Sequence, residues 1–263
     1  SWGHAPLSGQ HSMSMKKIGI GAGEEIGKVF SSIPGTDGSS RIIVYSRFGT
    51  VQLPIPPGVT LRECQDPSFS LADDLANGRI DAAIRGTLPA NSTLSSLKAA
   101  CGVDHLERAA LLETSDGRQF FLAPVGVDEG WTVGEKVALA CKARTLAEKF
   151  GLPSRIGILS GGRLGDVGRH PFVDRSLADA ELVARLTGGV HYEILIEDAI
   201  RDCGVIIAPD GISGNFIFRT LTFLGSGHGH GAPVLNIGKI FVDTSRATSG
   251  YANAIRLAES LLK

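Results

Sequence analysis

The stretch Val205-Ile206-Ile207-Ala208-Pro209-Asp210-Gly211-Ile212-Ser213-Gly214-Asn215 decides the fold class. Its first four residues are apolar and end at a proline, as expected for a strand that is buried on both faces. A short polar loop with glycines follows, and residues 214–224 then form an apolar helical pattern. A buried strand, a short loop and a helix in this order are the unit of a parallel sheet covered by helices.

The same alternation runs through most of the chain. Short runs rich in Ile and Val predict strands at residues 17–20, 41–45, 80–84, 119–123, 155–159, 205–208 and 239–242. Helical patterns lie between them, at residues 71–77, 93–101, 134–150, 174–186, 196–203, 214–224 and 248–262. The sequence therefore predicts an α/β protein with mostly parallel sheets and helices on both faces.

Breaks in the pattern predict where domains begin. Residues 1–14 are polar and turn-rich without periodicity, and we interpret them as an expression remnant or a disordered tail. Gly151-Leu152-Pro153 ends the longest helical pattern and precedes a new strand. We therefore predict a first domain from residue 15 to 152 and a second domain from residue 153.

Bulk composition limits the function classes. The 263 residues are 43% hydrophobic and 20% charged with a net charge of −1, so no overall field favours nucleic acid or an acidic membrane. The four cysteines are widely separated without a CxxC pair, which argues against disulfides and against a thiolate zinc site. No apolar run approaches the ~20 residues of a membrane helix. We expect a cytoplasmic protein that binds neither nucleic acid nor membrane.

Ligands of open α/β sheets bind beyond the carboxyl ends of the strands, so the loops there hold the candidate site. After residues 205–208, glycines and free amides at a helix start favour an anion. The candidate anion-binding residues of this loop are Asp210, Ser213, Gly214 and Asn215. The alternative is that Asp210 or Ser213 caps the helix, and the loop by itself favours capping.

Three further loops carry suitable side chains. They hold Arg85 and Thr87 after residues 80–84, Ser160 and Arg163 after residues 155–159, and Ser245-Arg246 after the last strand. A serine can hydrogen-bond a reacting carbonyl or phosphate, and an arginine holds phosphate through its planar fork. The alternative is structural, since Ser245 can cap a helix and an arginine can face water.

Two conspicuous motifs fit their familiar roles poorly. The glycines of residues 19–27 offer no frame at i, i+2 and i+5, so they predict a tightly packed strand–turn–helix and not a dinucleotide site. The imidazoles of Gly227-His228-Gly229-His230-Gly231 have no neighbouring carboxylate or thiolate in the sequence to complete a metal site. We interpret them as an exposed turn and assign no metal. The chain also lacks a Walker A sequence and a Gly-x-Ser-x-Gly elbow.

Together the loops resemble those of the phosphotransacetylase and phosphotransbutyrylase superfamily. Residues 205–221 resemble its "PD…GN…YK.L" signature, and residues 238–247 resemble its closing "G.K.P….SRA" segment. Within that superfamily, residues 83–90 and the glycine-rich start are similar to the MtxX group, methanogen marker protein 4, which carries a methyltransferase label. The resemblance implies a methanogenic archaeal source. It also implies two three-layer α/β/α domains of the isocitrate/isopropylmalate dehydrogenase type, with residues 153–243 as the second domain and residues 244–263 returning to the first.

The resemblance implies roles as well. Ser245 would match the active-site serine of the family and Arg246 the arginine that binds phosphate. Coenzyme A and phosphate would be substrates of a homodimer that holds no tightly bound cofactor. The acetyltransferases carry an acidic base several positions after the Ser-Arg pair, whereas this chain has no Asp or Glu between Arg246 and Glu259.

Three functions stay open on the sequence. Acyl transfer between phosphate and coenzyme A ranks first because the anion-binding loops are retained. A methyltransferase, or an accessory of one in methanogenic C1 metabolism, agrees with the label of the MtxX group, although the chain has no S-adenosylmethionine glycine motif. A non-catalytic protein that binds a phosphate or acyl-CoA metabolite agrees with the missing base.

Overall fold

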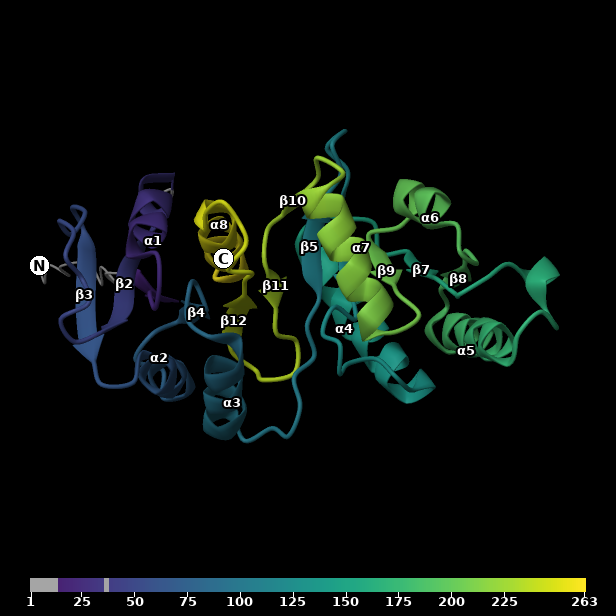
Figure 1. Ribbon diagram of the computed structural model, residues 1–263, viewed down its shortest axis with the longest axis horizontal. Coiled ribbons are helices and arrows are strands. Elements are labelled where there is room, and N and C mark those ends of the chain that lie inside the picture. Colours follow the sequence, from purple (N-terminus) through teal and green to yellow (C-terminus); the bar gives the residue numbers. More distant parts are fainter. Residues whose placement is uncertain (1–13, 36–37) are drawn as a thin grey trace, which may run out of the picture.

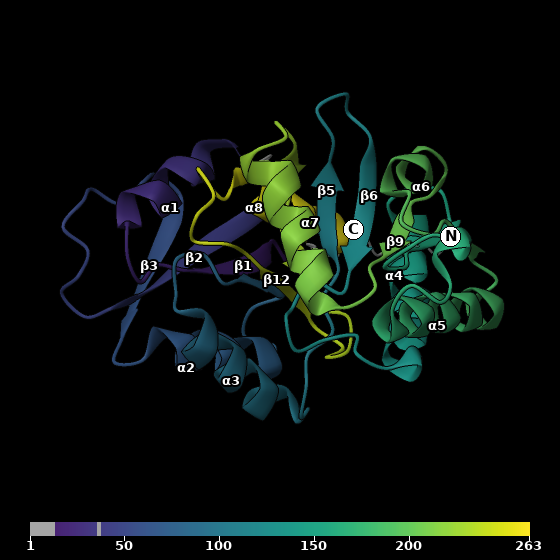
Figure 2. The same cartoon turned by 45° about the vertical axis from the view of Figure 1, so that its right-hand side comes forward.

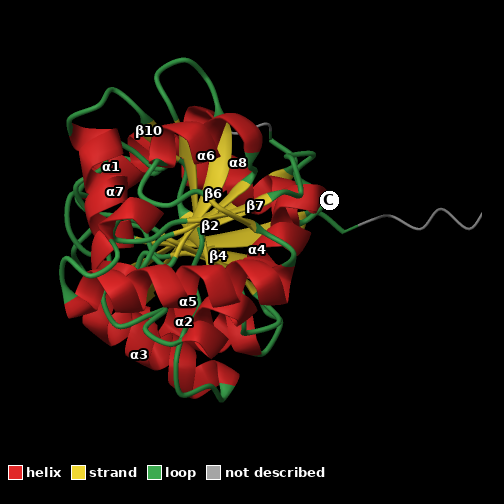
Figure 3. Ribbon diagram, turned by 90° about the vertical axis from the view of Figure 1, so that its right-hand side faces the viewer, coloured by secondary structure: helices red, strands yellow, loops and turns green. Residues whose placement is uncertain are grey.

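The computed structural model describes residues 14–35 and 38–263, in two six-stranded sheets that lie next to each other along the long axis (Figure 1). Residues 1–13, most of the expected leader, lie outside the described residues. Both sheets are dominated by parallel pairs and are covered by helices, which confirms the predicted α/β class. Figure 3, turned by 90°, shows the strands in the centre with helices around them.

The first sheet has the order β11-β12-β4-β1-β2-β3, and only β11 is antiparallel to its neighbour. Its strands are β1 (Lys16–Gly21), β2 (Ser40–Arg47), β3 (Val59–Cys64), β4 (Ala82–Ile84), β11 (Ala232–Pro233) and β12 (Ile240–Asp243). One face packs against α1 (Ile26–Ser32) and α8 (Ala252–Leu261), and the other against α2 (Pro67–Ala76) and α3 (Ala90–Cys101) (Figure 1). A 3₁₀ turn, Ile33–Gly35, follows α1.

The second sheet has the order β10-β5-β6-β9-β7-β8, in which β10 and β5 form the antiparallel pairs. Its strands are β5 (Ala110–Glu113), β6 (Gln119–Ala123), β7 (Ile156–Ile158), β8 (Val190–His191), β9 (Val205–Ile207) and β10 (His228–Gly229). One face packs against α4 (Val133–Lys149) and α5 (Pro171–Thr187), and the other against α6 (Ile196–Asp202) and α7 (Gly211–Phe223) (Figure 2). A 3₁₀ turn, Leu164–Asp166, precedes α5.

The seven predicted strands and seven predicted helices are all present, with ends that differ by a few residues. The structure adds five strands, and α1 is the helix of the strand–turn–helix predicted at residues 19–27. Among these, β3 is an edge strand made of half-buried and exposed residues, so it has no continuous apolar run. The strands β8, β10 and β11 have two residues each, which is too short for a periodic pattern.

The sheets divide the chain differently from the predicted boundary at residue 152. The elements β5, β6 and α4 precede that residue, yet β6 pairs with β9 and α4 packs over both strands. Conversely, β11 and β12 lie before residue 244 but belong to the first sheet. The chain therefore crosses between the sheets at residues 102–109 and again at residues 230–231. Gly151 does follow the end of α4 in the left-handed conformation, as predicted for a helix stop. The domain does not end there, because α4 packs on β9, which comes later in the chain.

The glycine-rich start folds as the predicted strand–turn–helix, from β1 into α1. A Cβ added to Gly19 would lie 2.8 Å from Cδ1 of Leu71 on α2 and 2.9 Å from Cε2 of Tyr45 on β2. Close approach of α2 and β2 to this strand therefore requires glycine.

No helix in the described ranges is long and apolar enough to cross a bilayer.

Candidate functional site

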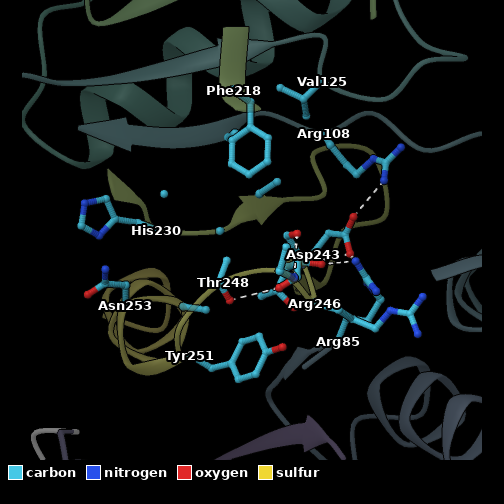
Figure 4. A pocket seen from close by; sticks show the side chains of 18 of the residues that line it. Arg85, Arg108, Val125, Phe218, His230, Asp243, Arg246, Thr248, Tyr251 and Asn253 are labelled. Atoms are coloured by element: carbon cyan, nitrogen blue, oxygen red, sulfur yellow. Dashed lines mark hydrogen bonds and ion pairs between the residues drawn. The ribbon is translucent and has the colours of Figure 1, made fainter. Parts of the chain in front are cut away.

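A cavity of about 420 Å³ lies between the two sheets, and we call it the intersheet pocket (Figure 4). The loop between β12 and α8 lines one side, and β5, α7 and the segment crossing from β10 to β11 line the other. Its polar side chains belong to Arg85, Arg108, Asn215, Arg219, His230, Asp243, Thr244, Ser245, Arg246, Thr248, Tyr251 and Asn253. The pocket therefore brings together four of the predicted site residues, which are Arg85, Asn215, Ser245 and Arg246.

Ser245 and Arg246 stand just beyond the carboxyl end of β12. The Oγ of Ser245 accepts a hydrogen bond from the Ala247 amide at 3.2 Å, and within the described chain no acceptor is seen for its own proton. Arg246 is about half exposed, with Nη1 3.6 Å from a carboxylate oxygen of the exposed Glu24. A surface pair of this kind contributes little stability, so both side chains remain available to a ligand. Because α8 begins only at Ala252, Ser245 is not its N-cap.

Tyr251 places an unpartnered hydroxyl at the pocket. The residue is 1% exposed, and no hydrogen-bond partner for its hydroxyl is found among residues 14–35 and 38–263. Burial raises the pKa of Tyr251, so the phenol keeps its proton and stays a donor. Figure 4 shows the hydroxyl turned toward the side of the pocket that Arg85 and Arg246 occupy. An unsatisfied buried donor costs about 1–3 kcal/mol, a cost that a ligand oxygen at this point would relieve.

Four charged side chains, Arg85, Asp243, Arg108 and Glu129, form what we call the buried charge chain. Nε of Arg85 lies 2.5 Å from one oxygen of Asp243, and Nη1 of Arg108 lies 2.8 Å from the other. Nε of Arg108 also contacts Glu129, at 2.7 Å. Burial by itself would lower the pKa of Arg108, but the charges of Glu129 and Asp243 outweigh burial and raise it. Two arginines and two carboxylates are neutral together, so the chain adds no net charge to the pocket.

Two other arginines give the pocket its positive character. Arg219, on α7, has no ion-pair partner in the described part of the chain, and its guanidinium carbon lies 5.2 Å from the centre of the Phe223 ring. Arg246 enters from the loop after β12. Because neither charge is neutralised by a buried carboxylate, the pocket favours an anionic ligand.

At the start of α7, the side chain of Asp210 caps the helix, which was the alternative that the sequence favoured. The carboxylate of Asp210 accepts hydrogen bonds from the amide and the hydroxyl of Ser213, at 2.8 and 2.9 Å. A Cβ on Gly214 would lie 1.8 Å from the Pro124 carbonyl oxygen, so this glycine serves close packing. Asn215 alone of the four lines the pocket, and its Nδ2 donates to the Val125 carbonyl at 2.9 Å. The structure thus shows the capping alternative at this helix start, and the anion-binding role of Asp210, Ser213 and Gly214 stays a prediction.

Thr87, Ser160 and Arg163 do not line the intersheet pocket. Thr87 is buried, and its Oγ1 accepts the Gly23 amide at 3.0 Å. The buried hydroxyl of Ser160 donates to the Gly162 carbonyl at 2.9 Å and lies 2.8 Å from Nε2 of His191. Arg163 is exposed, ahead of the 3₁₀ turn. The loop after β7 thus uses its polar groups to hold its own shape.

Sequence reasoning missed Arg108, Arg219 and His230 as pocket residues. Nothing near Arg108 or Arg219 in the sequence signals a site. His230 does belong to a conspicuous motif, but the predicted exposure applies only to His228, which lies in strand β10 and not in a turn. The imidazole of His230 is 17% exposed, and its Nε2 lies 2.8 Å from an oxygen of Glu113. The carboxylate that the motif lacks in its own stretch of sequence is therefore supplied by Glu113, 117 residues away.

Comparison with known proteins places the chain in a family. It is 49% identical over 212 residues to "Putative methyltransferase mtx subunit X" of Methanosarcina mazei, an alignment that covers 79% of this chain and 76% of that protein. The chain belongs to the MtxX family. An uncharacterized methyltransferase of Methanopyrus kandleri is 43% identical over 75% of this chain and 81% of its own length. No protein-family model matches the chain.

Solved structures give this MtxX chain the fold of the phosphotransacetylases. A branched-chain phosphotransacylase from Enterococcus faecalis superposes with a TM-score of 0.73 at 17% identity, covering 95% of this chain and 100% of that one. Isocitrate dehydrogenase from Methylococcus capsulatus superposes with a TM-score of 0.52 at 12% identity, over 94% and 85% of the two chains. Both confirm the predicted fold type, and at these identities the likeness concerns the fold alone.

Proposed function

We propose that this protein transfers an acyl group between phosphate and the thiol of coenzyme A in the intersheet pocket. The observation that carries the proposal is the convergence of Ser245, the unpartnered Tyr251 hydroxyl and two arginines, Arg219 and Arg246, that no buried carboxylate neutralises, on one cavity. Phosphate would lie against Arg246, whose planar fork matches two phosphate oxygens. The fold shared with phosphotransacylases agrees with the proposal.

The proposed chemistry needs little beyond positioning and charge stabilisation. The thiolate sulfur forms a bond to the acyl carbonyl carbon, and the bond from that carbon to the phosphate oxygen breaks. Negative charge develops on the carbonyl oxygen in between, and the hydroxyl proton of Ser245 would stabilise it. The Tyr251 hydroxyl would donate to a phosphate oxygen beside Arg246.

Replacing Ser245 by Ala should lower kcat for acetyl or butyryl transfer by about 10²–10³-fold, the loss typical of one oxyanion donor. Release of inorganic phosphate on addition of coenzyme A to the acyl phosphate measures the reaction. Ser249→Ala is the matched control, because Ser249 is exposed in the same loop and does not line the pocket.

A second arm tests the anion site without turnover. Calorimetry with inorganic phosphate should show binding to the wild type and weaker binding to Tyr251→Phe, by roughly 5-fold for a hydrogen bond worth about 1 kcal/mol. A wild type that binds phosphate but transfers no short acyl chain would reduce the proposal to a binding protein. Equal transfer rates for Ser245→Ala and Ser249→Ala would refute the role of Ser245.

Methyl transfer is the second candidate, because the relatives carry that name. In that case the pocket would hold a methyl donor, and its two arginines would hold carboxylate or phosphate groups of the donor or acceptor. Calorimetry with S-adenosylmethionine and with methylated thiols separates the two candidates. Micromolar binding of either donor without acyl transfer would favour the methyltransferase.

A further inference from the structure

Among the described residues, the lining of the intersheet pocket contains one carboxylate, and it is poorly placed to act as a base. Asp243 accepts from Arg85 on one oxygen and from Arg108 on the other, and the Thr244 amide adds a third bond at 3.0 Å. Both oxygens of this carboxylate are therefore already occupied as acceptors of guanidinium hydrogen bonds. Glu259, the first acid after Arg246, lies buried on α8 and does not line the pocket. We therefore infer that another group in the cavity wall accepts the proton.

His230 is an imidazole in that wall, on the segment where the chain crosses between the sheets. Its amide donates to the Leu111 carbonyl at 2.9 Å, which fixes the backbone against β5. Its Nε2 lies 2.8 Å from Oε2 of Glu113, and Nε2 of Gln119 donates to the same oxygen at 3.1 Å. Within the described ranges, no hydrogen bond reaches the other ring nitrogen, Nδ1. In Figure 4 the His230 ring stands on the Asn253 side of the pocket, away from Arg85 and Arg108.

This geometry fixes the tautomer of His230. A hydrogen bond from Gln119 and a second from His230 lower the pKa of Glu113, so the carboxylate is ionised at neutral pH. An ionised carboxylate accepts, which places a proton on Nε2 and leaves the Nδ1 lone pair free in the neutral ring. A carboxylate that orients an imidazole and stabilises its charged form is the arrangement that activates general bases in acyl transfer.

We propose that His230, oriented by Glu113, is the general base that takes the proton from the coenzyme A thiol. This inference rests on the acyl transfer proposed above. The S–H bond breaks as Nδ1 takes the proton, and the sulfur lone pair forms the new bond to the acyl carbon. The departing phosphate leaves with the electron pair of its C–O bond and then receives the proton from the imidazolium. Atoms and charges balance without any other reactant.

Several charged groups surround the imidazole. Glu113 on β5 contacts it, and Arg219 on α7 and Arg246 in the loop after β12 line the same cavity. Arg85, Arg108 and Asp243 of the buried charge chain also line the cavity, and His228 on β10 is a titratable group two residues away. Of these, the Glu113 carboxylate is the one in contact, at 2.8 Å.

The test is the pH profile of kcat for acyl transfer in His230→Gln and Glu113→Gln. His230→Gln should lower kcat by about 10²–10⁴-fold and remove the acid limb, with the KM for acyl phosphate unchanged. Glu113→Gln should keep an acid limb but move it to lower pH, because the imidazolium loses its anionic partner. His228→Gln is the matched control, since that exposed imidazole lies two residues away and outside the pocket lining.

The outcomes separate the two proposals. An active wild type with equal kcat in His230→Gln and His228→Gln overturns the base assignment and leaves acyl transfer standing. A wild type without any acyl transfer overturns both. If His230→Gln fails to fold, His230→Ala with added imidazole replaces it, and recovery of kcat with imidazole supports the assignment. The assignment is overturned if His230→Ala folds, its low residual kcat is not raised by imidazole, and that residual kcat keeps the acid limb of the wild type.

Discussion

At the scale of single residues, Glu113 shows how two hydrogen bonds set a protonation state. Gln119 and His230 both bond to its Oε2, and together they lower the pKa of Glu113 against the opposing effect of burial. A carboxyl with a lowered folded pKa contributes stability above its unfolded pKa of about 4.3. That contribution is lost as the pH falls through the folded value.

The wild type should therefore lose more unfolding free energy than Glu113→Gln when the pH is lowered from 6 to 3. The variant has no carboxyl to protonate at this position, while all other acidic residues are the same in both proteins. Urea unfolding at pH 6, 4 and 3 measures the difference. Glu148→Gln, at an exposed position on α4, should follow the wild type. Parallel profiles for the wild type and Glu113→Gln would contradict the link between Glu113 and its two partners.

At the scale of elements, the stability of α7 depends on its N-cap residue, Asp210. Asp210 has an extended backbone and bonds to the Ser213 amide, which satisfies one of the free donors at the helix start. Its negative charge also complements the positive end of the helix dipole. The same helix supplies Asn215, Phe218 and Arg219 to the pocket, so the cap positions one wall of the site.

Asp210→Ala should lower the free energy of unfolding by about 1 kcal/mol, within the usual 0.5–2 kcal/mol for a lost N-cap. Asp210→Ser should retain most of that stability, because a serine oxygen can accept the same bond. Thr220→Ala, at an exposed position within α7, should change stability by about 0.5 kcal/mol or less. If Asp210→Ser loses phosphate binding while keeping its stability, the carboxylate has a ligand role that capping does not explain.

At the scale of the whole molecule, two crossing segments, an ion pair and the packing of α4 near α8 join the sheets. The segments lie side by side, since the Ala109 amide bonds to the Pro233 carbonyl and the Leu111 amide to that of Gly231. Arg108, which leads into β5, contacts Asp243 at the end of β12. One hydrophobic cluster also contains residues of α8 and α4, and Nζ of Lys149 bonds to the Leu261 carbonyl. The pocket is therefore bounded by a continuous structure.

Asp243→Asn should destabilise the protein by about 3 kcal/mol, because removing one charge of a buried pair leaves its partner uncompensated. Here two arginines, Arg85 and Arg108, would lose their shared partner. Guanidinium unfolding followed by circular dichroism measures the loss. The control is Asp198→Asn, which breaks an exposed pair with Arg201 on α6 and should cost less than about 1 kcal/mol. Equal costs for the two variants would show that burial of the charge chain contributes no stability.

Local sequence patterns predicted most elements and part of the site. Runs of Ile and Val marked the central strands, and Gly151 marked the end of α4. The ends of β4 and β12, with Arg85, Ser245 and Arg246, were predicted to face a site because parallel strands meet at one edge of a sheet. The same rule failed for Thr87 and Ser160, whose hydroxyls bond within their own half of the molecule.

The sequence by itself determined the alternation of strands and helices, the cap of α7 and the Ser245-Arg246 pair at a strand end. Each depends on neighbours within a few residues, where backbone geometry leaves few alternatives. Only the tertiary structure decided which sheet each strand joins, and it paired His230 with Glu113 and Arg108 with Asp243 across 117 and 135 residues. Such pairings depend on how whole layers pack, because the free energy that selects them is summed over both cores and is not encoded near either residue.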